Sequence, residues 1–368
     1  MTSRPTSIVV IVLITTLAAC SAAESAQPSA RQSTQSTSTP GTSISVESPS
    51  PAASGWAKLS SSETSPAPRE DHTWTITPDG ATAYLFGGRD GATVYDDLWA
   101  YTLVTGAWQA ATPSGATPPA RFGHNAAWAP GIGLVIFAGQ GTSAFFGDLR
   151  AYDPDSNTWR MLPANGAAPV SRYGSCGSIG PDGRFWISHG FTSDGQRFAD
   201  TKAYDFETAT WTDETPVADA PIPRCLHACW WTDDGDMILY GGQTTGTTAL
   251  GDRWRLTVGE RPGTNAWTEL PPSVESPADR NLYASTRWGA GTLVFGGQGL
   301  DGGYLADAWW LADDGSTQPV DTGPDAPPAR SGAELIADSA RGRLLLFGGR
   351  DDQAVFGDLW RLSLSPLP

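Results

Sequence analysis

Short apolar runs alternate with glycine-rich and acidic turns along the chain from Trp56 to the C-terminus. In one representative stretch the runs cover 122–128, 133–138 and 148–153, and a fourth surrounds Trp159. Each run has the length of a β-strand, and each is bounded by residues that favour turns. The pattern therefore predicts units of four short strands rather than helices.

Four landmarks repeat at intervals of about 52 residues and divide the chain into six units. An arginine begins the first strand of each unit, at Arg69, Arg121, Arg172, Arg224, Arg280 and Arg330. A pair of residues containing glycine closes the second strand, at Gly87-Gly88, Ala138-Gly139, His189-Gly190, Gly241-Gly242, Gly296-Gly297 and Gly348-Gly349. An aspartate opens the third strand, at Asp97, Asp148, Asp200, Asp252, Asp307 and Asp358. A tryptophan closes four of the units, at Trp108, Trp159, Trp211 and Trp267.

A unit of four short strands cannot cover both faces of its own sheet, so it must pack against copies of itself. Radial packing of six such sheets gives a β-propeller. The runs YLFGG (84–88), DDLWAY (96–101) and NTW (157–159) resemble the Kelch repeat, and the resemblance covers essentially the whole of residues 55–368. We therefore expect an all-β, six-bladed Kelch β-propeller built from four-stranded antiparallel sheets.

The spacing at the two ends of the chain predicts how the ring closes. Thirteen residues separate each closing tryptophan from the next arginine, and thirteen also separate Trp56 from Arg69. The segment 55–61 is therefore the fourth strand of a unit whose other three strands lie at the C-terminus. We expect this N-terminal strand to pair with the C-terminal blade.

The composition agrees with a folded β-protein. Apolar residues make up 39% of the 368 residues, and the chain contains 42 glycines and 29 prolines, which excludes wholesale disorder and disfavours long helices. Lysine and arginine together number 23 against 39 aspartates and glutamates, so the net charge is −16. This balance excludes a general nucleic-acid-binding protein.

The first residues have the pattern of a secretory signal peptide, assigned to 1–19. Arg4 precedes an apolar run over 8–19 that is too short for a permanent membrane span. The run ends in LAAC at Cys20, which resembles the bacterial lipobox and implies that Cys20 carries a lipid. The alternative is an ordinary cleaved signal with an incidental cysteine. We expect the protein to be lipid-anchored on the outer face of the bacterial cell membrane.

Residues 20–54 comprise the lipidated cysteine and a segment rich in serine, threonine and proline, without an aromatic residue. Such a segment cannot bury enough apolar surface to fold. We expect a disordered tether that holds the propeller clear of the membrane, so that the lipid alone contacts the bilayer.

The six repeat arginines are candidate ligand-binding residues: Arg69, Arg121, Arg172, Arg224, Arg280 and Arg330. The resemblance implies that the first strand of each blade lines the central channel, which would place these arginines around one mouth. Guanidinium groups there would bind carboxylate, phosphate or sulfate in bidentate geometry. The alternative is a structural role, in which each arginine pairs with backbone or with the aspartate of its own repeat.

Three residues after each arginine stand His72, His124, Ser175, His227, Tyr283 and Ala333. We expect His72, His124, His227 and Tyr283 to line the channel as candidate ligand-binding residues. Separate blades do not obviously bring the histidines close enough together for shared coordination of a metal, so no metal site and no cofactor are expected. The alternative is that these histidines pack against backbone.

The cysteines of the first strands raise the question of a disulfide. Cys225 and Cys229 are about 13 Å apart if both lie in one strand, too far for a bond. Cys176 lies in the equivalent strand of the preceding unit and can face either of them across the interface between blades. We favour Cys176–Cys229, because their heights along the two strands agree, and an exported protein is suited to a disulfide.

Glu334 is the candidate catalytic residue. It lies four residues after Arg330, where the other units have small or uncharged residues, and it precedes Leu335 and Ile336. Burial there would raise the pKa of its carboxyl, as a general acid or base requires. The alternative is an ion pair with Arg330 or Arg69 in a hydrated channel.

Two functions are consistent with these features. The first is an extracytoplasmic, membrane-tethered monomeric binding module that recognises a protein or glycan through loops on the arginine face, and an anionic ligand would suit those arginines. The alternative is a carbohydrate-active enzyme acting on an anionic sugar, similar to the six-bladed sialic acid mutarotase, with Arg69, Arg330 and Glu334 as its functional groups. The ligand sets of the Kelch enzyme galactose oxidase and of plant specifier proteins are not recognisable in this chain. We favour binding over catalysis.

Overall fold

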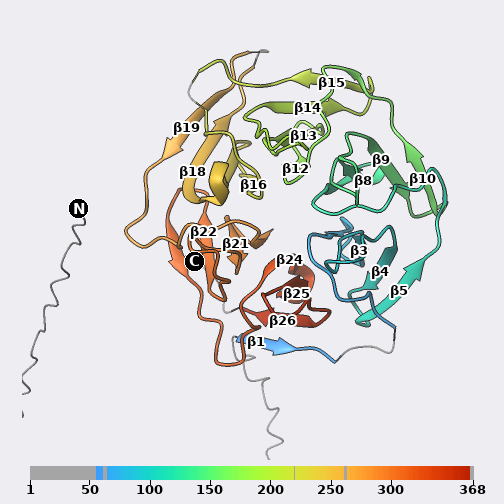
Figure 1. Ribbon diagram of the computed structural model, residues 1–368, viewed down its shortest axis with the longest axis vertical. Helices are drawn as coiled ribbons and strands as arrows, with labels where there is room; N and C mark the ends of the chain where they lie inside the picture. The colour runs from blue at the N-terminus through green and yellow to red at the C-terminus, as the bar shows by residue number, and fades with distance from the viewer. Residues whose placement is uncertain (1–54, 61–63, 219, 261–262, 365–368) are drawn as a thin grey trace, which may run out of the picture. The chain divides into compact units, whose positions relative to one another are not determined.

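The computed structural model describes residues 55–60, 64–218, 220–260 and 263–364. Within these ranges the chain forms six antiparallel sheets that stand as blades around a central axis (Figure 1). This arrangement confirms the expected all-β, six-bladed propeller. The signal peptide, Cys20 and tether predicted for 1–54 lie outside the described residues. Among the helical segments that the structure describes, none is long and apolar enough to cross a membrane.

Each blade is a meander whose first strand faces the axis. Blade 1 contains β2 (Thr73–Ile76), β3 (Thr82–Phe86), β4 (Leu98–Thr102) and β5 (Ala107–Ala111). Blade 2 contains β7 (Asn125–Ala129), β8 (Gly133–Phe137), β9 (Leu149–Asp153) and β10 (Thr158–Met161). Blade 3 contains β12 (Cys176–Ile179), β13 (Phe185–Ser188), β14 (Thr201–Asp205) and β15 (Thr210–Asp213).

The remaining blades follow the same order. Blade 4 contains β16 (Ala228–Trp231), β17 (Met237–Gln243), β18 (Ala249–Thr257) and β19 (Ala266–Leu270). Blade 5 contains β20 (Ala284–Arg287), β21 (Gly291–Phe295), β22 (Ala308–Ala312) and β23 (Thr317–Pro319). Blade 6 contains β24 (Ser331–Asp338), β25 (Arg343–Arg350), β26 (Leu359–Ser363) and β1 (Gly55–Lys58). Two short 3-10 turns, η1 (Thr245–Thr247) and η2 (Ser339–Arg341), complete the regular structure of the described residues.

Two blades depart from the expected four strands. The two-residue strands β6 (Ser114–Gly115) and β11 (Asn165–Gly166) pair in parallel with the outer strands β10 and β15. Blades 2 and 3 are therefore five-stranded sheets. Each added strand comes from the segment that enters the blade, and it covers an outer edge that would otherwise present unpaired backbone groups.

Blade 6 joins the two ends of the chain, as the spacing predicted. β1 pairs antiparallel with β26, with Trp56 opposite Leu362. The strand ends at Lys58, although the Leu59 N–H still donates to the Leu359 carbonyl at 2.8 Å. The ring is thus closed by a strand from one end of the propeller and three strands from the other (Figure 1).

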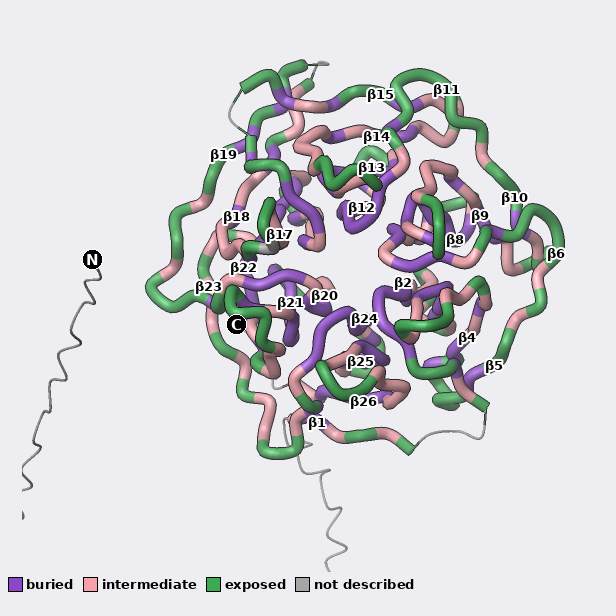
Figure 2. Tube along the Cα trace, viewed as in Figure 1, coloured by how far each residue is buried: buried purple, intermediate pink, exposed green. Residues whose placement is uncertain are grey.

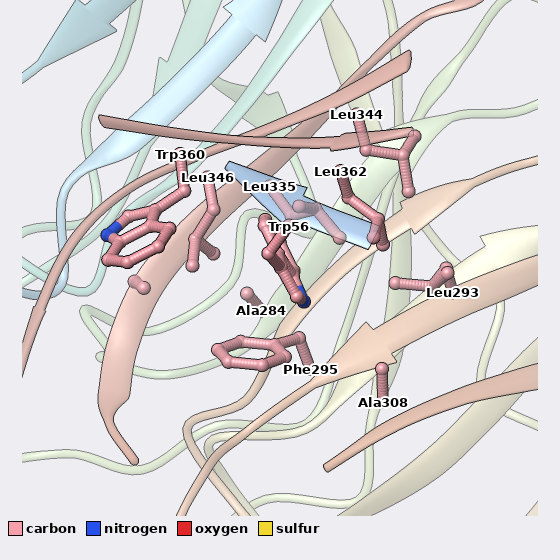
Figure 3. Packing of buried hydrophobic residues seen from close by; sticks show 11 residues of the cluster. Trp56, Ala284, Leu293, Phe295, Ala308, Leu335, Leu344, Leu346, Trp360 and Leu362 are labelled. Carbon is pink, nitrogen blue, oxygen red and sulfur yellow. The ribbon is translucent and has the colours of Figure 1, made fainter. Parts of the chain in front are cut away.

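The hydrophobic core is divided into six clusters, each between two neighbouring blades. Burial is therefore concentrated towards the axis and between the sheets, while the circumference and the turns are exposed (Figure 2). At the closing blade, Trp56 lies between Leu335, Leu346 and Leu362 on one side and Phe295 of blade 5 on the other (Figure 3). The centroids of the Trp56 and Phe295 rings are 5.1 Å apart.

A closed circle of backbone hydrogen bonds ties the six blades together at the axis. We call the residues that form it the girdle: Asp71, Gly123, Gly174, Leu226, Leu282 and Gly332. Each N–H donates to the carbonyl of the girdle residue in the preceding blade, at 2.7–3.2 Å, and Asp71 completes the circle by donating to Gly332. All six residues have φ between 53° and 64°, a left-handed conformation that glycine adopts without strain.

A disulfide between Cys176 and Cys229 links the inner strands of blades 3 and 4, as predicted. Cys225 is free and buried. The bond closes a loop with a sequence separation of 53 residues. Since such a bond restricts the unfolded chain, we expect Cys176→Ser to lower the free energy of unfolding by about 2 to 4 kcal/mol.

Urea unfolding of the oxidised Cys176→Ser variant and of the wild type measures this difference. A reducing agent should destabilise the wild type by a similar amount and leave the variant unchanged. Equal unfolding midpoints of the oxidised variant and the oxidised wild type would show that the bond does not stabilise the ring.

Candidate functional site

The six repeat arginines are buried and fully engaged. Each has an exposed fraction of 0%. In blade 3, Arg172 Nη1 and Nη2 donate to the two carboxylate oxygens of Asp200 at 2.7 and 2.9 Å, and Nη1 also donates to the His189 carbonyl at 2.8 Å. The other five blades repeat this bidentate pair through Arg69–Asp97, Arg121–Asp148, Arg224–Asp252, Arg280–Asp307 and Arg330–Asp358.

Hydrogen bonds and charge from the paired arginine hold the pKa below its usual value in five of these aspartates: Asp97, Asp148, Asp252, Asp307 and Asp358. Burial alone would raise the pKa of the Asp252 carboxyl, but hydrogen bonds from Arg224 and from the Trp254 indole hold that pKa below its usual value. The prediction that the six arginines form a ligand-binding ring is therefore wrong: each guanidinium is occupied by its own repeat and shielded from solvent. The structure instead shows the alternative, a structural role in which each arginine pairs with the aspartate of its own repeat and with backbone.

A different set of residues surrounds the channel mouth. The residue directly after each glycine-containing pair is half-buried, and we call these six residues the rim: Arg89, Gln140, Phe191, Gln243, Gln298 and Arg350. Each rim residue forms a backbone bridge with the residue that follows a repeat arginine, as in Glu70–Arg89 and Ser331–Arg350. Because Glu70 directly precedes the girdle residue Asp71, this bridge places the rim around the entrance above the girdle.

A cluster of charged side chains lies at this entrance, on blades 1 and 6. Arg89 Nε is 3.1 Å from Glu70 Oε1, and Arg89 Nη2 donates to Asp71 Oδ2 at 3.0 Å. From blade 6, Arg350 Nη1 reaches the same Glu70 oxygen at 3.4 Å. The Arg89 guanidinium also stacks over the Phe122 ring at 4.2 Å. Two half-exposed cations thus share two buried carboxylates.

A tyrosine from blade 3 completes the cluster. The Tyr173 hydroxyl donates to Asp71 Oδ2 at 3.2 Å, although the two residues are 102 positions apart. Its ring crosses over Gly123 of blade 2, where a Cβ would lie only 1.9 Å from a ring carbon. Glycine is therefore needed at position 123 for two reasons: its φ of 58° is left-handed, and the Tyr173 ring leaves no room for a Cβ.

Burial controls the protonation of these groups. It raises the pKa of Glu70 to about 7, and the neighbouring charge of Asp71 adds to this effect while Arg89 and Arg350 oppose it. Burial likewise raises the pKa of Asp71, against the opposing charge of Arg89. The pKa of Tyr173 lies well above its usual value because the ring is buried beside Asp71. The cluster therefore exchanges a proton near neutral pH.

The predicted histidines and tyrosine do line the channel. A cavity of about 120 Å³ at the girdle is lined by His72, His124, His227 and Tyr283 together with Glu334. A second cavity of about 270 Å³ continues beyond the girdle and shares four of these five residues with the first. The cavity linings come from the inner strands and the segments that enter them. These residues are therefore brought together, and their role in ligand binding stays a prediction.

The contacts of these side chains are those of a packed core. His124 Nε2 lies 2.8 Å from the Thr73 hydroxyl, and the Tyr283 hydroxyl donates to the Tyr240 carbonyl at 2.7 Å. Burial lowers the pKa of His124 to about 3 and holds the pKa of His227 well below its usual value. The imidazoles are therefore neutral. Among the described residues, no three His, Cys, Asp or Glu side chains are placed to hold a metal ion.

Glu334 lies half-buried in β24 and lines both cavities. Burial raises the pKa of its carboxyl to about 8, and the charge of Asp71 contributes to the rise. Arg69 and Arg330, the partners considered in the alternative, are both engaged by the aspartates of their own blades. The predicted desolvation is therefore present, and an ion pair with either arginine is not formed.

Sequence reasoning missed the rim and the entrance cluster. The signal for the rim was available, because each rim residue directly follows a glycine-containing pair that already served as a landmark. Two of the six rim positions carry arginine, and these two lie on adjacent blades 1 and 6. The contact of Tyr173 with Asp71 could not be predicted from the spacing, since Asp71 belongs to blade 1 and Tyr173 to blade 3.

Known proteins share this repeat. Residues 48–235 and 214–367 match the family described as the KLHDC2/KLHL20/DRC7 Kelch-repeats domain. Adagio-like protein 3 of Oryza sativa subsp. japonica is 26% identical over 309 residues, which cover 78% of this chain and 48% of that protein. Kelch domain-containing protein 3 of Bos taurus is 26% identical over 243 residues, which cover 63% of this chain and 62% of that protein.

A solved structure titled "Structure of YjhT" matches with a TM-score of 0.63 at 17% identity, over 80% of this chain and 95% of that one, which supports the fold alone. The chain spans about half the length of the rice relative. The two family matches together reach from residue 48 to residue 367 and include all six arginine–aspartate pairs. The chain therefore belongs to the Kelch-repeat family.

Proposed function

We propose that this protein is a binding module whose rim face recognises a protein or glycan ligand that carries anionic groups. The observation that carries the proposal is the contrast between the two sets of residues at the channel mouth. The repeat arginines are sealed inside the blades, whereas the rim presents one half-exposed side chain from each blade. The rim is thus the part of this face whose side chains remain accessible to a ligand.

The chemistry of the rim suits such a ligand. Arg89 and Arg350 supply positive charge, Gln140 and Gln298 supply amide donors and acceptors, and Phe191 supplies an aromatic surface. Arginine and aromatic side chains are enriched at the centres of protein interfaces, and aromatic rings stack on sugars. In a chain with a net charge of −16, the local positive charge that this site carries when Glu70 is protonated would attract an anionic group selectively.

We further propose that the protein is exported and lipid-anchored through Cys20, and that it acts as a monomer outside the cell membrane. The signal-like segment at 1–19 supports this proposal, as does the Cys176–Cys229 disulfide, since disulfides persist in oxidising compartments. The test is metabolic labelling with a radioactive fatty acid. Label in the wild type and its loss in Cys20→Ser would support the anchor, and equal labelling of both would refute it.

The binding proposal predicts that negative charge on the rim weakens the interaction. The double variant Gln140→Glu with Gln298→Glu adds two carboxylates on opposite sides of the mouth. We expect at least about a tenfold loss of affinity for a ligand identified on a glycan array or by crosslinking at the cell envelope, because like charges repel across an interface.

The matched control adds the same charge elsewhere. Val104→Glu with Thr208→Glu places two carboxylates in exposed turns between the third and fourth strands, at the opposite end of the blades from the rim. Affinity in this variant should stay within about twofold of the wild type. An equal loss in both double variants would reflect net charge alone, and an unchanged affinity in the rim variant would contradict the proposal.

A further inference from the structure

Two arginines of the rim are held on one buried oxygen atom. Arg89 Nε and Arg350 Nη1 lie 3.1 and 3.4 Å from Glu70 Oε1. About a third of each arginine side chain is exposed, at 32% and 37%, whereas the Glu70 side chain is only 2% exposed. The two cations approach from adjacent blades and already hold a carboxylate between them. Their exposed sides open to the channel mouth.

Whether the charges of Arg89 and Arg350 are neutralised depends on the protonation of the carboxylates that they contact. Glu70 is faced by Asp71 on its own segment, by Arg89 from the segment after β3 and by Arg350 at the end of β25. Beyond them, Tyr173 donates to Asp71, Glu334 in β24 interacts with the charge of Asp71, and Tyr304 contacts Arg350. With both carboxylates ionised the two arginines are neutralised. When Glu70 takes up a proton, the cluster gains one positive charge.

We propose that Arg89 and Arg350 form a binding site for a carboxylate group of the ligand, and that Glu70 takes up one proton from solvent as that carboxylate binds. The incoming group replaces Glu70 as the anion shared by the two guanidinium groups. It is a carboxylate because carboxylate oxygens, Glu70 Oε1 and Asp71 Oδ2, are what the two guanidinium groups already hold. The proposal refines the rim-face binding site proposed above, but its test uses a small probe and does not need the natural ligand.

The step balances in charge. One carboxylate enters and one proton joins the Glu70 carboxyl, so the cluster keeps its overall charge while the ligand is neutralised. Because Glu70 exchanges its proton near neutral pH, the ionised form prevails in mild alkali and competes with the ligand. Binding should therefore weaken as the pH rises, by about tenfold between about pH 6 and about pH 8 for one linked proton.

Isothermal titration calorimetry with fumarate and the full-length protein tests the proposal. Fumarate is a dianion throughout this pH range, so its own protonation does not contribute. Titrations in buffers of different ionisation enthalpy count the protons taken up. We expect uptake of about one proton per fumarate in mild alkali and about a tenfold weaker Kd at the higher pH. Absence of fumarate binding to the wild type overturns the proposal.

Three variants show which residue takes up the proton and whether the arginine pair binds the carboxylate. Glu70→Gln is expected to bind fumarate with nearly the same Kd at both pH values and without proton uptake. Arg350→Gln is expected to lose at least about tenfold in affinity, as removal of one partner of a charged hydrogen bond does. Glu334→Gln should keep the pH dependence of the wild type, because its carboxyl does not contact either arginine. If Glu70→Gln fails to fold, the proton count on the wild type decides.

The results separate this inference from the proposed function. An unchanged pH dependence of the fumarate Kd in folded Glu70→Gln overturns the role of Glu70. Loss of that pH dependence in Glu334→Gln also overturns it, because Glu334 would then be the group that takes up the proton. Failure of the rim double variant to affect the natural ligand would instead contradict the proposed function. Fumarate binding to the Arg89 and Arg350 pair would still stand in that case.

Discussion

Deletion of residues 55–60 is expected to unfold the propeller. This segment contains β1, which supplies the outer strand of blade 6 and the buried Trp56. Its loss exposes the edge of β26 and removes Trp56 from a cluster formed by blades 5 and 6 (Figure 3). At about 25 cal/mol per Å² of apolar surface, burial of a tryptophan and its neighbours contributes several kcal/mol, which is comparable with the whole stability of many domains.

Thermal melts followed by circular dichroism measure the effect. The full-length chain without residues 55–60 should show no cooperative transition, or a midpoint lowered by well over about 10 °C. Deletion of residues 21–50 is the control, since it leaves β1 and the rest of the described propeller intact. Equal melting of the two deletion variants would mean that β1 does not stabilise the ring.

Replacement of a repeat arginine is expected to have the second-largest effect. Arg172→Met removes two hydrogen bonds to Asp200 and one each to the His189 and Val170 carbonyls. Asp200 would then be left without its partner in a partly buried position. Breaking a buried ion pair on one side costs about 3 to 5 kcal/mol, so we expect a loss of that size in the free energy of unfolding.

Urea unfolding of three variants tests this prediction. Arg160→Met, at an exposed position of β10, should remain within about 0.5 kcal/mol of the wild type. The double variant Arg172→Met with Asp200→Leu should recover part of the loss, because it leaves no unpaired charge. A loss below about 1 kcal/mol in Arg172→Met would show that the pair is not a structural clamp of the blade.

The fold could be predicted because the sequence repeats the same physical constraints six times. The glycine-containing pairs, the aspartates and the tryptophans recur at fixed intervals, and each interval sets the length of a strand or a turn. The distance from Trp56 to Arg69 equals the distance from Trp108 to Arg121, which identified the closing strand. The two-residue strands β6 and β11 escaped prediction, because they are short and carry no apolar pattern.

The role of the repeat arginines was misjudged for a physical reason. The spacing placed Arg172 correctly at the start of an inner strand, but exposure depends on where its side chain points. It points into its own blade and meets Asp200, 28 positions later, rather than the channel. The same interval recurs in other blades, so arginine and aspartate at this spacing indicate a clamp within a blade.

The entrance cluster could not be predicted from spacing, because its members meet across blades. Glu70 and Arg350 are 280 positions apart and become neighbours only when blade 6 closes against blade 1. Tyr173 reaches Asp71 only because Gly123 leaves room for its ring. Contacts of this kind depend on the closed ring, so the candidate site follows from the fold rather than from any motif.

Crosslinking of the two ends tests the closed ring most directly. In the register of β1 with β26, Ala57 lies opposite Arg361. The pair Ala57→Cys with Arg361→Cys should therefore form an intramolecular link on mild oxidation or with a short thiol crosslinker, detected by mass spectrometry as joined peptides in a monomer. Ala57→Cys with Thr210→Cys, which places the second thiol in blade 3, should form none. A link of equal yield in the control, or links only between separate molecules, would contradict closure of the ring by β1.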